Sequence, residues 1–267
     1  MTGSRFCPPA LRRRESFPRY RAAHTVDTVT PPPFPRSDAV PPPDFAPLVA
    51  RALALVPDGA RLGLGTGHAA AAFVEALGVK VRAGFRVVGV PTSEATAHLA
   101  ARLGIPLTTL DETPELDLAV DGADEVDPRG DLIKGFGGAL IRERIVAASA
   151  RRFVVLVGHE KLVPALGARG KLPDEIVPFA RGPATRQLAA MGLRPELRRL
   201  NGEAVVTDNG DYILDCAIGP LTDPAAVERA VHALPGVVGT GLFLGMDPTV
   251  LVLGPDGTVT EHPRPER

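Results

Sequence analysis

The 267-residue chain lacks three features that would each point to a particular class of protein. Its two cysteines, Cys7 and Cys216, fit neither a disulfide framework nor a metal-binding spacing. No apolar run approaches the length of a transmembrane helix. The formal net charge is −1, so no excess charge of one sign attracts nucleic acid or an anionic membrane. We therefore expect a globular cytoplasmic protein with no nucleic-acid or membrane partner.

Lysine is also scarce, because arginine supplies most of the 30 basic residues. The lysines are Lys80, Lys134, Lys161 and Lys171. A GC-rich genome would explain this bias without any functional cause. A lysine ammonium is nevertheless a compact charge with a tunable pKa, which arginine cannot replace everywhere. The lysines that remain are therefore candidates for chemistry, and Lys134 and Lys161 flank Glu143.

Residues 1–43 differ in composition from the rest of the chain. They hold ten of the 28 prolines, the basic run at 12–14 and no lysine. The segment lacks the apolar periodicity that would offset the entropy of ordering it. We predict a disordered Pro/Arg-rich extension, a tail or a misplaced start, and favour this over a targeting peptide because the prolines oppose an amphipathic helix.

Strands and helices alternate from residue 44 to about residue 158, which predicts a parallel sheet with helices on both faces. Asp44 and Ser93 are the expected N-caps of two of the helices. Helices are predicted over 44–56, 65–78, 93–104 and 139–150. Strands are predicted over 61–65, 85–91, 116–121 and 152–158.

The pattern after Pro173 becomes a mixture of helices and hairpins. A helix is predicted around 184–191 and another over 224–234, with strands near 203–207, 211–218 and 241–245. Asn209-Gly210 indicates a hairpin between two of these strands, and 249–259 forms a second hairpin-like pair. We expect residues 44–172 with 242–267 to form a Rossmann-like α/β domain, and residues 173–241 to form a smaller α+β, ferredoxin-like lobe.

Two places at the expected carboxyl edge of the sheet could carry chemistry. The first is the glycine turn Gly65–Gly67, where backbone N–H groups at a helix start could bind phosphate. Glycines in such turns are as often present only for tight geometry, so this signal is weak alone.

The second place is the segment from Asp121 to Glu143. An acidic loop with a glycine hinge is usually only solvated, and Asp127 and Asp131 fit that description. Asp121, however, ends a predicted strand, Lys134 precedes a glycine turn, and Glu143 lies on the next helix. A carboxylate that takes a proton and a lysine that holds an enolate oxygen would suit proton abstraction beside a carbonyl.

From about residue 44 to residue 259 the chain resembles the type A family of ribose-5-phosphate isomerases. The matching segments occur in family order: GLGTG (63–67), VPTSEAT (90–96), AVDGADEVD (119–127), KGFGGALIRERIV (134–146), EKLV (160–163), LPDEIVPFA (172–180), VTDNGDYILD (206–215) and PGVVGTGLF (235–243). The resemblance implies interconversion of ribose 5-phosphate and ribulose 5-phosphate, without metal or other cofactor, in a homodimer or homotetramer.

The resemblance also implies roles for individual residues. Glu143 would be the base, and Asp121 would help to open the sugar ring. Lys134, with the backbone N–H groups of the Gly135–Gly138 turn, would stabilise the enediolate oxygen. Asp124 would orient sugar hydroxyls. The remaining residues implied to bind substrate are Thr66, Gly67, His68, Gly122, Ala123, Gly135, Gly137 and Lys161.

Three positions depart from the family pattern and concern binding more than chemistry. His68 and Ala69 stand where a Ser-Thr pair is usual, and the region around Phe45 lacks a phosphate-reaching lysine. Phe136 interrupts a glycine triplet and restricts that turn. A non-catalytic sugar-phosphate sensor and an isomerase of a related sugar phosphate therefore stay open as alternatives.

Overall fold

The structure is a computed structural model that describes residues 44–263. The chain divides into two units, residues 1–33 and residues 34–267, and all described residues belong to the second. The predicted extension over 1–43 lies outside the described residues. Between residues 44 and 263, no helix is both long and apolar enough to cross a membrane.

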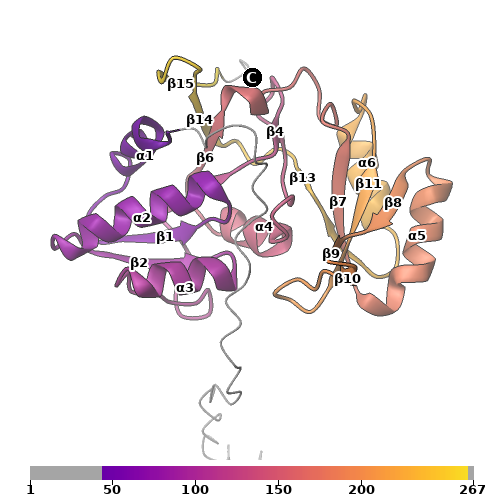
Figure 1. The fold of residues 1–267 in the computed structure, drawn as a ribbon, viewed down its shortest axis with the longest axis horizontal. Helices are drawn as coiled ribbons and strands as arrows, with labels where there is room; N and C mark the ends of the chain where they lie inside the picture. The colour runs from indigo at the N-terminus through magenta and orange to yellow at the C-terminus, as the bar shows by residue number, and fades with distance from the viewer. Residues whose placement is uncertain (1–43, 264–267) are drawn as a thin grey trace, which may run out of the picture. The chain divides into compact units, whose positions relative to one another are not determined.

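A six-stranded sheet forms the larger part of the fold (Figure 1). Its strands are β1 (Ala60–Leu64), β2 (Val87–Pro91), β3 (Leu118–Gly122), β6 (Phe153–Gly158), β14 (Thr249–Leu253) and β15 (Val259–Glu261). They lie in the order β15-β14-β6-β3-β1-β2, with parallel pairing except at β15, which is antiparallel to β14. The predicted parallel sheet and the hairpin at its edge are both confirmed.

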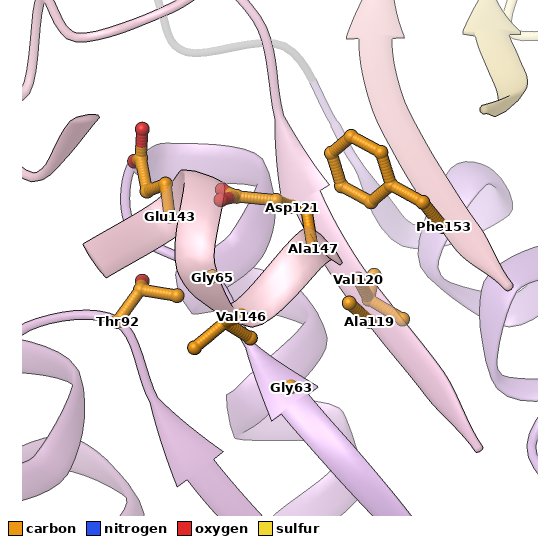
Figure 2. Close-up of a pocket in the computed structure, with 10 residues that line it drawn as sticks. All are labelled: Gly63, Gly65, Thr92, Ala119, Val120, Asp121, Glu143, Val146, Ala147 and Phe153. Carbon is orange, nitrogen blue, oxygen red and sulfur yellow. The ribbon is translucent and has the colours of Figure 1, made fainter. Parts of the chain in front are cut away.

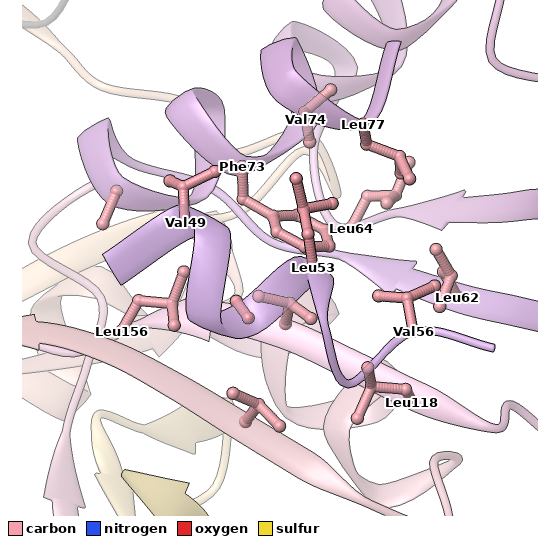
Figure 3. Packing of buried hydrophobic residues seen from close by; sticks show 14 of the residues in the cluster. Val49, Leu53, Val56, Leu62, Leu64, Phe73, Val74, Leu77, Leu118 and Leu156 are labelled. Atoms are coloured by element: carbon pink, nitrogen blue, oxygen red, sulfur yellow. The ribbon is translucent and has the colours of Figure 1, made fainter. Parts of the chain in front are cut away.

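Both faces of this sheet are buried, as a strand of consecutive apolar residues requires. In β6, Val154 and Leu156 belong to one apolar cluster, whereas Val155 and Val157 belong to another. The first cluster contains apolar residues of α1 (Ala46–Leu53), α2 (His68–Arg82) and α3 (Glu94–Arg102), and Figure 3 shows their packing. The second contains Val146 and Ala147 of α4 (Leu140–Ala148).

The helix starts follow the expected capping chemistry with one shift. The Ser93 side chain accepts a hydrogen bond from the Thr96 N–H, which confirms it as the N-cap of α3. Phe45, not Asp44, occupies the N-cap position of α1. Asp44 still accepts a hydrogen bond from the Ala46 N–H, at 2.9 Å, so it satisfies a free donor from one position earlier.

The smaller lobe has a ferredoxin-like topology. Its strands are β7 (Lys171–Ile176), β8 (Arg194–Leu197), β11 (Tyr212–Ala217) and β12 (Val237–Thr240), in the antiparallel order β12-β7-β11-β8. The lobe helices are α5 (Arg181–Ala190), after β7, and α6 (Pro224–His232), after β11. The first strand of the lobe, β7, begins at Lys171, and its last strand, β12, ends at Thr240. The exact domain boundaries at 172/173 and 241/242 remain predictions.

The hairpin predicted at Asn209-Gly210 is wrong in its partner strand. Across that turn the chain forms one isolated bridge, between Val206 and Tyr212. The strand that precedes the turn, β10 (Glu203–Ala204), pairs instead with β9 (Arg199–Leu200). Asn209 of this turn instead makes hydrogen bonds to Arg142 and Glu175, and these bonds hold the turn in place.

A short three-stranded sheet carries the segment that leads to the catalytic candidates. It consists of β4 (Glu125–Val126), β5 (Leu132–Ile133) and β13 (Leu242–Phe243), in the order β13-β5-β4. Because two of these strands frame the acidic loop, Asp127 is not solvated as expected but only 4% exposed. Its carboxylate accepts hydrogen bonds from the N–H groups of Arg129 and Asp131 and so holds the turn.

Candidate active site

The predicted chemistry residues meet at one edge of the parallel sheet, beyond the carboxyl ends of its strands. β1 ends at Leu64 and leads into the Gly65–Gly67 turn, while neighbouring β3 ends with Asp121 and Gly122. Next to β3, β6 ends at Gly158 and leads into a single helical turn, η1 (His159–Lys161). Three segments far apart in sequence therefore reach the same edge.

Gly65 lets the Asp121 side chain occupy the space between β1 and β3. A Cβ atom on Gly65 would overlap the carboxylate and the Cα of Asp121, so no larger residue fits without displacing it. Asp121 Oδ1 accepts hydrogen bonds from the backbone N–H groups of Thr66, at 3.1 Å, and Gly122, at 2.7 Å. Backbone donors of this kind stabilise the ionised carboxylate.

Lys134 joins Asp121 to Glu143. Its Nζ lies 3.1 Å from Asp121 Oδ2 and 3.3 Å from Glu143 Oε2. It also donates a hydrogen bond of 2.5 Å to the Gly122 carbonyl. Exposure of the three charged residues is 2% for Lys134, 3% for Asp121 and 4% for Glu143, so water screens their interactions weakly. One buried ammonium thus serves two buried carboxylates.

The charges of this triad shift the proton affinities of all three groups. Burial raises the pKa of Glu143 to about 8, against the opposing attraction of Lys134. Burial likewise raises the pKa of Asp121, again opposed by Lys134. Burial alone would lower the pKa of Lys134, but the Asp121 and Glu143 carboxylates outweigh it and raise that pKa above its ordinary value. Lys134 therefore stays charged.

Glu143 has fewer hydrogen-bond donors than Asp121. This difference favours Glu143 as the group that exchanges a proton near neutral pH. Asp121 accepts two backbone hydrogen bonds besides its contact with Lys134, and these favour its ionised form against the effect of burial. Glu143 Oε2, in contrast, accepts no hydrogen bond from the residues described, although Lys134 lies 3.3 Å away. A carboxylate with few donors and a raised pKa is suited to general base catalysis.

An apolar pocket beneath the two carboxylates explains why they are poorly solvated (Figure 2). Asp121, Glu143 and Thr92 supply its polar atoms. The remaining lining residues are Gly63, Gly65, Ala119, Val120, Val146, Ala147 and Phe153. The apolar side chains come from β3, β6 and α4, so the same core packing that builds the sheet also raises the pKa of Glu143.

The glycine turn after Lys134 is held by Asp124 and Arg198. Asp124 Oδ2 accepts a hydrogen bond of 2.9 Å from the Phe136 N–H. Arg198 Nη1 donates to the carbonyls of Gly135 and Phe136, at 2.8 and 3.2 Å. The Gly138 N–H bonds to the Gly135 carbonyl. Two N–H groups of this turn, which the sequence offered as oxyanion donors, are therefore already engaged.

Phe136 is placed by its ring and not only by its backbone. The Lys171 Nζ lies 4.1 Å from the centroid of the Phe136 ring, in the position of a cation–π contact. The ring also packs against the apolar core of the lobe. The residue that departs from the glycine triplet thus ties this turn to the lobe.

The residues predicted to bind substrate fall into two groups. Gly122, Ala123, Asp124, Gly135 and Gly137 lie in the two segments that carry the triad, and Gly137 is exposed. Thr66, Gly67, His68 and Lys161 lie at the ends of β1 and β6. Gly67 is the N-cap of α2, without a capping side chain, and His68 is the first residue of this helix.

Thr66 is already surrounded by other hydroxyl groups. Its Oγ1 lies 2.7 Å from Thr92 Oγ1, 2.8 Å from Ser93 Oγ and 3.2 Å from Thr96 Oγ1. Three partners use the bonding capacity of one hydroxyl. This cluster fixes the Gly65–Gly67 turn against the start of α3, and a substrate contact by the Thr66 hydroxyl stays a prediction.

The sequence assigned no role to Glu125 or Arg142, and it did not predict the long-range contact of Asn209. Glu125 is fully buried and accepts hydrogen bonds from the N–H groups of Gly167 and Arg169, which anchors the loop after Lys161. Arg142, beside Glu143, bonds to Asn209 of the lobe. The Asn-Gly pair was interpreted as a turn alone, and no local pattern indicates its long-range partner.

No group of three or more histidine, cysteine or acidic residues is arranged to hold a metal ion within residues 44–263. At the triad, the Lys134 ammonium occupies the position between the two carboxylates. The site therefore carries its own fixed positive charge.

The fold and the site are those of an α/β enzyme, with a buried carboxylate and a buried lysine side by side at the carboxyl edge of the sheet. Comparison with known proteins identifies the family within this class. The family model of ribose 5-phosphate isomerase A (phosphoriboisomerase A) matches residues 88–257. The chain belongs to the ribose 5-phosphate isomerase A family.

Similar proteins cover most of the chain. Ribose-5-phosphate isomerase A of Roseiflexus castenholzii is 54% identical over 212 residues, which is 78% of this chain and 91% of that protein. The Bradyrhizobium diazoefficiens protein of the same name is 48% identical and covers 81% of this chain and 95% of its own length.

Solved structures of the same family also resemble this chain in three dimensions. Ribose 5-phosphate isomerase A of Methanocaldococcus jannaschii aligns with a TM-score of 0.75 at 40% identity, covering 80% of this chain and 96% of its own. A D-ribose-5-phosphate isomerase solved with phospho-erythronic acid aligns with a TM-score of 0.78 at 38% identity, covering 82% and 96%.

Proposed function

We propose that this protein interconverts ribose 5-phosphate and ribulose 5-phosphate through an enediolate. The observation that carries the proposal is the buried set of Glu143, Lys134 and Asp121, with Lys134 within 3.3 Å of both carboxylates. Family membership supports the reaction, and a relative of similar structure binds phospho-erythronic acid, an acid phosphate of sugar-like size.

The charges of the site fit the charges of the reaction. Glu143 removes a proton from the carbon beside the carbonyl and returns it to the neighbouring carbon. The substrate oxygen becomes negative as the proton leaves, and the Lys134 ammonium stabilises that charge in a poorly screened environment. Asp121, whose ionised form is favoured by its backbone donors, accepts and returns hydroxyl protons as the sugar ring opens.

Substrate binding is assigned to the segments around the triad. Asp124 and the backbone of Gly122 and Ala123 orient the sugar hydroxyls, next to the turn that holds Gly135 and Gly137. The phosphate lies near Lys161, Gly67, Thr66 and His68, where the uncapped start of α2 offers backbone N–H groups. We also propose a homodimer or homotetramer that works in the cytoplasm, which light scattering and cell fractionation would test.

The decisive test is turnover of ribose 5-phosphate by the purified protein, with and without a chelator. We expect activity in both conditions, because the ammonium of Lys134 supplies the positive charge. Glu143→Gln should lower kcat by at least about 100-fold, the usual contribution of a positioned general base. Glu115→Gln, an exposed carboxylate in the ion pair with Arg151, serves as the matched control and should keep full activity.

Two outcomes would refute this assignment. Binding of ribose 5-phosphate without any turnover by the wild-type protein would favour a sensor. A higher kcat/KM for another aldose phosphate than for ribose 5-phosphate would favour a related substrate.

A further inference from the structure

A turn of the lobe, residues 207–211, reaches the helix that carries Glu143. Arg142, the residue before Glu143 in α4, makes three hydrogen bonds outside its own helix. Its Nε donates to Asn209 Oδ1 at 3.0 Å, and its Nη2 donates to the Asp208 carbonyl at 2.7 Å. Its Nη1 donates to Glu94 Oε1 at 2.9 Å. One guanidinium therefore binds two separate segments.

These two segments also bind each other. The Glu94 N–H, at the start of α3, donates a hydrogen bond of 2.8 Å to Asp208 Oδ2. Arg142, Glu94 and Asp208 therefore form a closed set in which each residue contacts the other two. Because the residue before Glu94 is Ser93, whose hydroxyl contacts Thr66, the set also continues to the Gly65–Gly67 turn.

The turn is itself fixed to the sheet of the lobe. Glu175 of β7 is fully buried, and its Oε1 accepts hydrogen bonds from Thr207 Oγ1, at 2.9 Å, and Asn209 Nδ2, at 3.0 Å. Asn209 thus bonds Glu175 with its amide nitrogen and Arg142 with its amide oxygen. The chain of contacts runs without a gap from the lobe sheet to α4.

α4 is held elsewhere by the fully buried Leu140 and by Arg144, which donates hydrogen bonds to Glu228 and to the carbonyls of Thr240 and Leu242. The N-cap of α4, Ala139, offers no side-chain cap. The preceding turn contains Gly135 and Gly138, both with positive φ, and is held by Asp124 and Arg198. Glu143 lies in the first turn of α4, and its Oε2 accepts no hydrogen bond from the described residues. Apart from Lys134, which lies 3.3 Å from Oε2, the placement of the carboxylate depends on the helix that carries it.

We propose that Arg142 is a positioning residue that holds Glu143 in its catalytic position by tying α4 to Glu94 and to the lobe turn at Asp208 and Asn209. The inference rests on the proposed function. It gives the lobe an indirect part in the reaction, because the lobe turn helps to position the base without touching substrate.

The test compares Arg142→Met, Arg142→Lys and Asn209→Ala with the wild-type enzyme. Displacing a catalytic group by about 1 Å can lower the rate about 100-fold, so we expect Arg142→Met to lower kcat by about 10- to 100-fold. KM should change by less than about threefold, because substrate contacts stay in place. Arg142→Lys, which keeps the charge and part of the bonding, should recover part of the lost kcat.

Asn209→Ala removes one of the two hydrogen bonds between the turn and Arg142 without changing α4, and the bond to the Asp208 carbonyl remains. It should lower kcat by less than Arg142→Met, with little change in KM. The double variant Arg142→Met/Asn209→Ala should be no slower than Arg142→Met, because Arg142→Met already removes the bond that Asn209→Ala breaks. Arg151→Met is the matched control, since Arg151 makes an exposed ion pair with Glu115 just beyond α4, and it should keep the wild-type kcat.

Four results would overturn the inference while leaving the isomerase assignment intact. The first two are a wild-type kcat in Arg142→Met, and a raised KM with unchanged kcat in that variant. The third is an equal loss of kcat in Arg142→Met and Arg142→Lys that follows a fall in melting temperature. The fourth is a double variant whose loss of kcat is the product of the two single losses. If Arg142→Met does not fold, the kcat of Asn209→Ala alone decides. An inactive wild-type protein would instead refute the proposed function.

Discussion

The Lys134 ammonium lies 3.3 Å from Glu143 Oε2, and both side chains are almost completely buried. A buried ion pair costs much desolvation energy, so it adds less to stability than its short distance suggests. Its value here is chemical, because the ammonium remains charged beside a carboxylate that can take up a proton. The first two predictions test this relationship.

Replacing Lys134 by methionine should abolish isomerase activity and destabilise the protein. It leaves the Asp121 and Glu143 carboxylates buried without a cation, and breaking a buried pair in this way costs about 3–5 kcal/mol. The loss should be smaller at pH 5 than at pH 8, since the carboxylates can then be protonated. Urea unfolding at both pH values measures this difference, and an equal loss at both would contradict it.

Activity and stability should change in opposite directions with pH because of Glu143. The base must be ionised, so kcat/KM should rise as the pH rises through its raised pKa of about 8. In the unfolded chain Glu143 ionises near its ordinary pKa of 4.5, whereas in the folded protein it keeps its proton up to about pH 8. Its contribution to stability is thus complete below pH 4.5 and is lost progressively up to pH 8.

Glu143→Gln separates this effect from other titrations. The variant should lack the part of the stability loss between pH 4.5 and pH 8 that belongs to Glu143, as measured by melting temperature across this range. A kcat/KM of the wild type that stays constant from about pH 6 to 9 would show that Glu143 is not the titrating base.

Asp174 should destabilise the lobe at neutral pH. This residue is fully buried in β7 between Leu172 and Ile176, its Oδ1 has no hydrogen-bond partner among the described residues, and its Oδ2 accepts a hydrogen bond from Cys216 at 3.2 Å. Burial raises its pKa to about 7, so its penalty develops between the ordinary value of 3.8 and pH 7.

We expect Asp174→Asn to increase the free energy of unfolding by roughly 2 kcal/mol at pH 8 and by little at pH 4. Chemical denaturation at both pH values measures this difference, and turnover of ribose 5-phosphate should remain close to that of the wild type. A variant that is less stable than the wild type at pH 8 would contradict the expectation.

Gly65→Ala should disable the site through one methyl group. The added Cβ overlaps Asp121, and overpacking of this kind costs about 1–3 kcal/mol. Displaced Asp121 also loses its contact with Lys134, so kcat should fall. Gly182→Ala, in the exposed part of α5, is the control, because its Cβ would have ordinary contacts and alanine favours helices. Equal melting temperatures and rates in the two variants would disprove the close approach at Gly65.

The sequence predicted the parallel sheet, the hairpin of β14 and β15 and the meeting of Asp121, Lys134 and Glu143 at the sheet edge more accurately than the lobe. The core strands are runs of consecutive apolar residues, and such a signal is local. The strands β4, β5, β9, β10 and β13 are each two residues long and show no period that could be detected. β7 contains Pro173, where the sequence pattern changes and a domain boundary was predicted, although one strand runs through it and pairs on both sides.

Asn209 shows where local reasoning ends. The Asn-Gly pair predicts a turn, and the turn exists, but its expected strand partner does not. Glu175 and Arg142 attract the turn through hydrogen bonds, and these residues lie 34 and 67 positions away in the chain. Likewise, Asp127 was predicted to be a solvated acid, and only the fold shows that its buried carboxylate holds an exposed turn.

By itself, the sequence determined which residues could do the chemistry, because residue type and order are local properties. Glu143, Lys134 and Asp121 were identified in this way, as was their place at strand ends and beside a glycine turn. Only the tertiary structure decided their protonation and their support. Burial against the apolar pocket raises the pKa of Glu143, and the contact of Arg142 with the lobe turn connects segments that no sequence pattern joins. Both effects arise from packing between distant segments, and packing is not encoded at any one position.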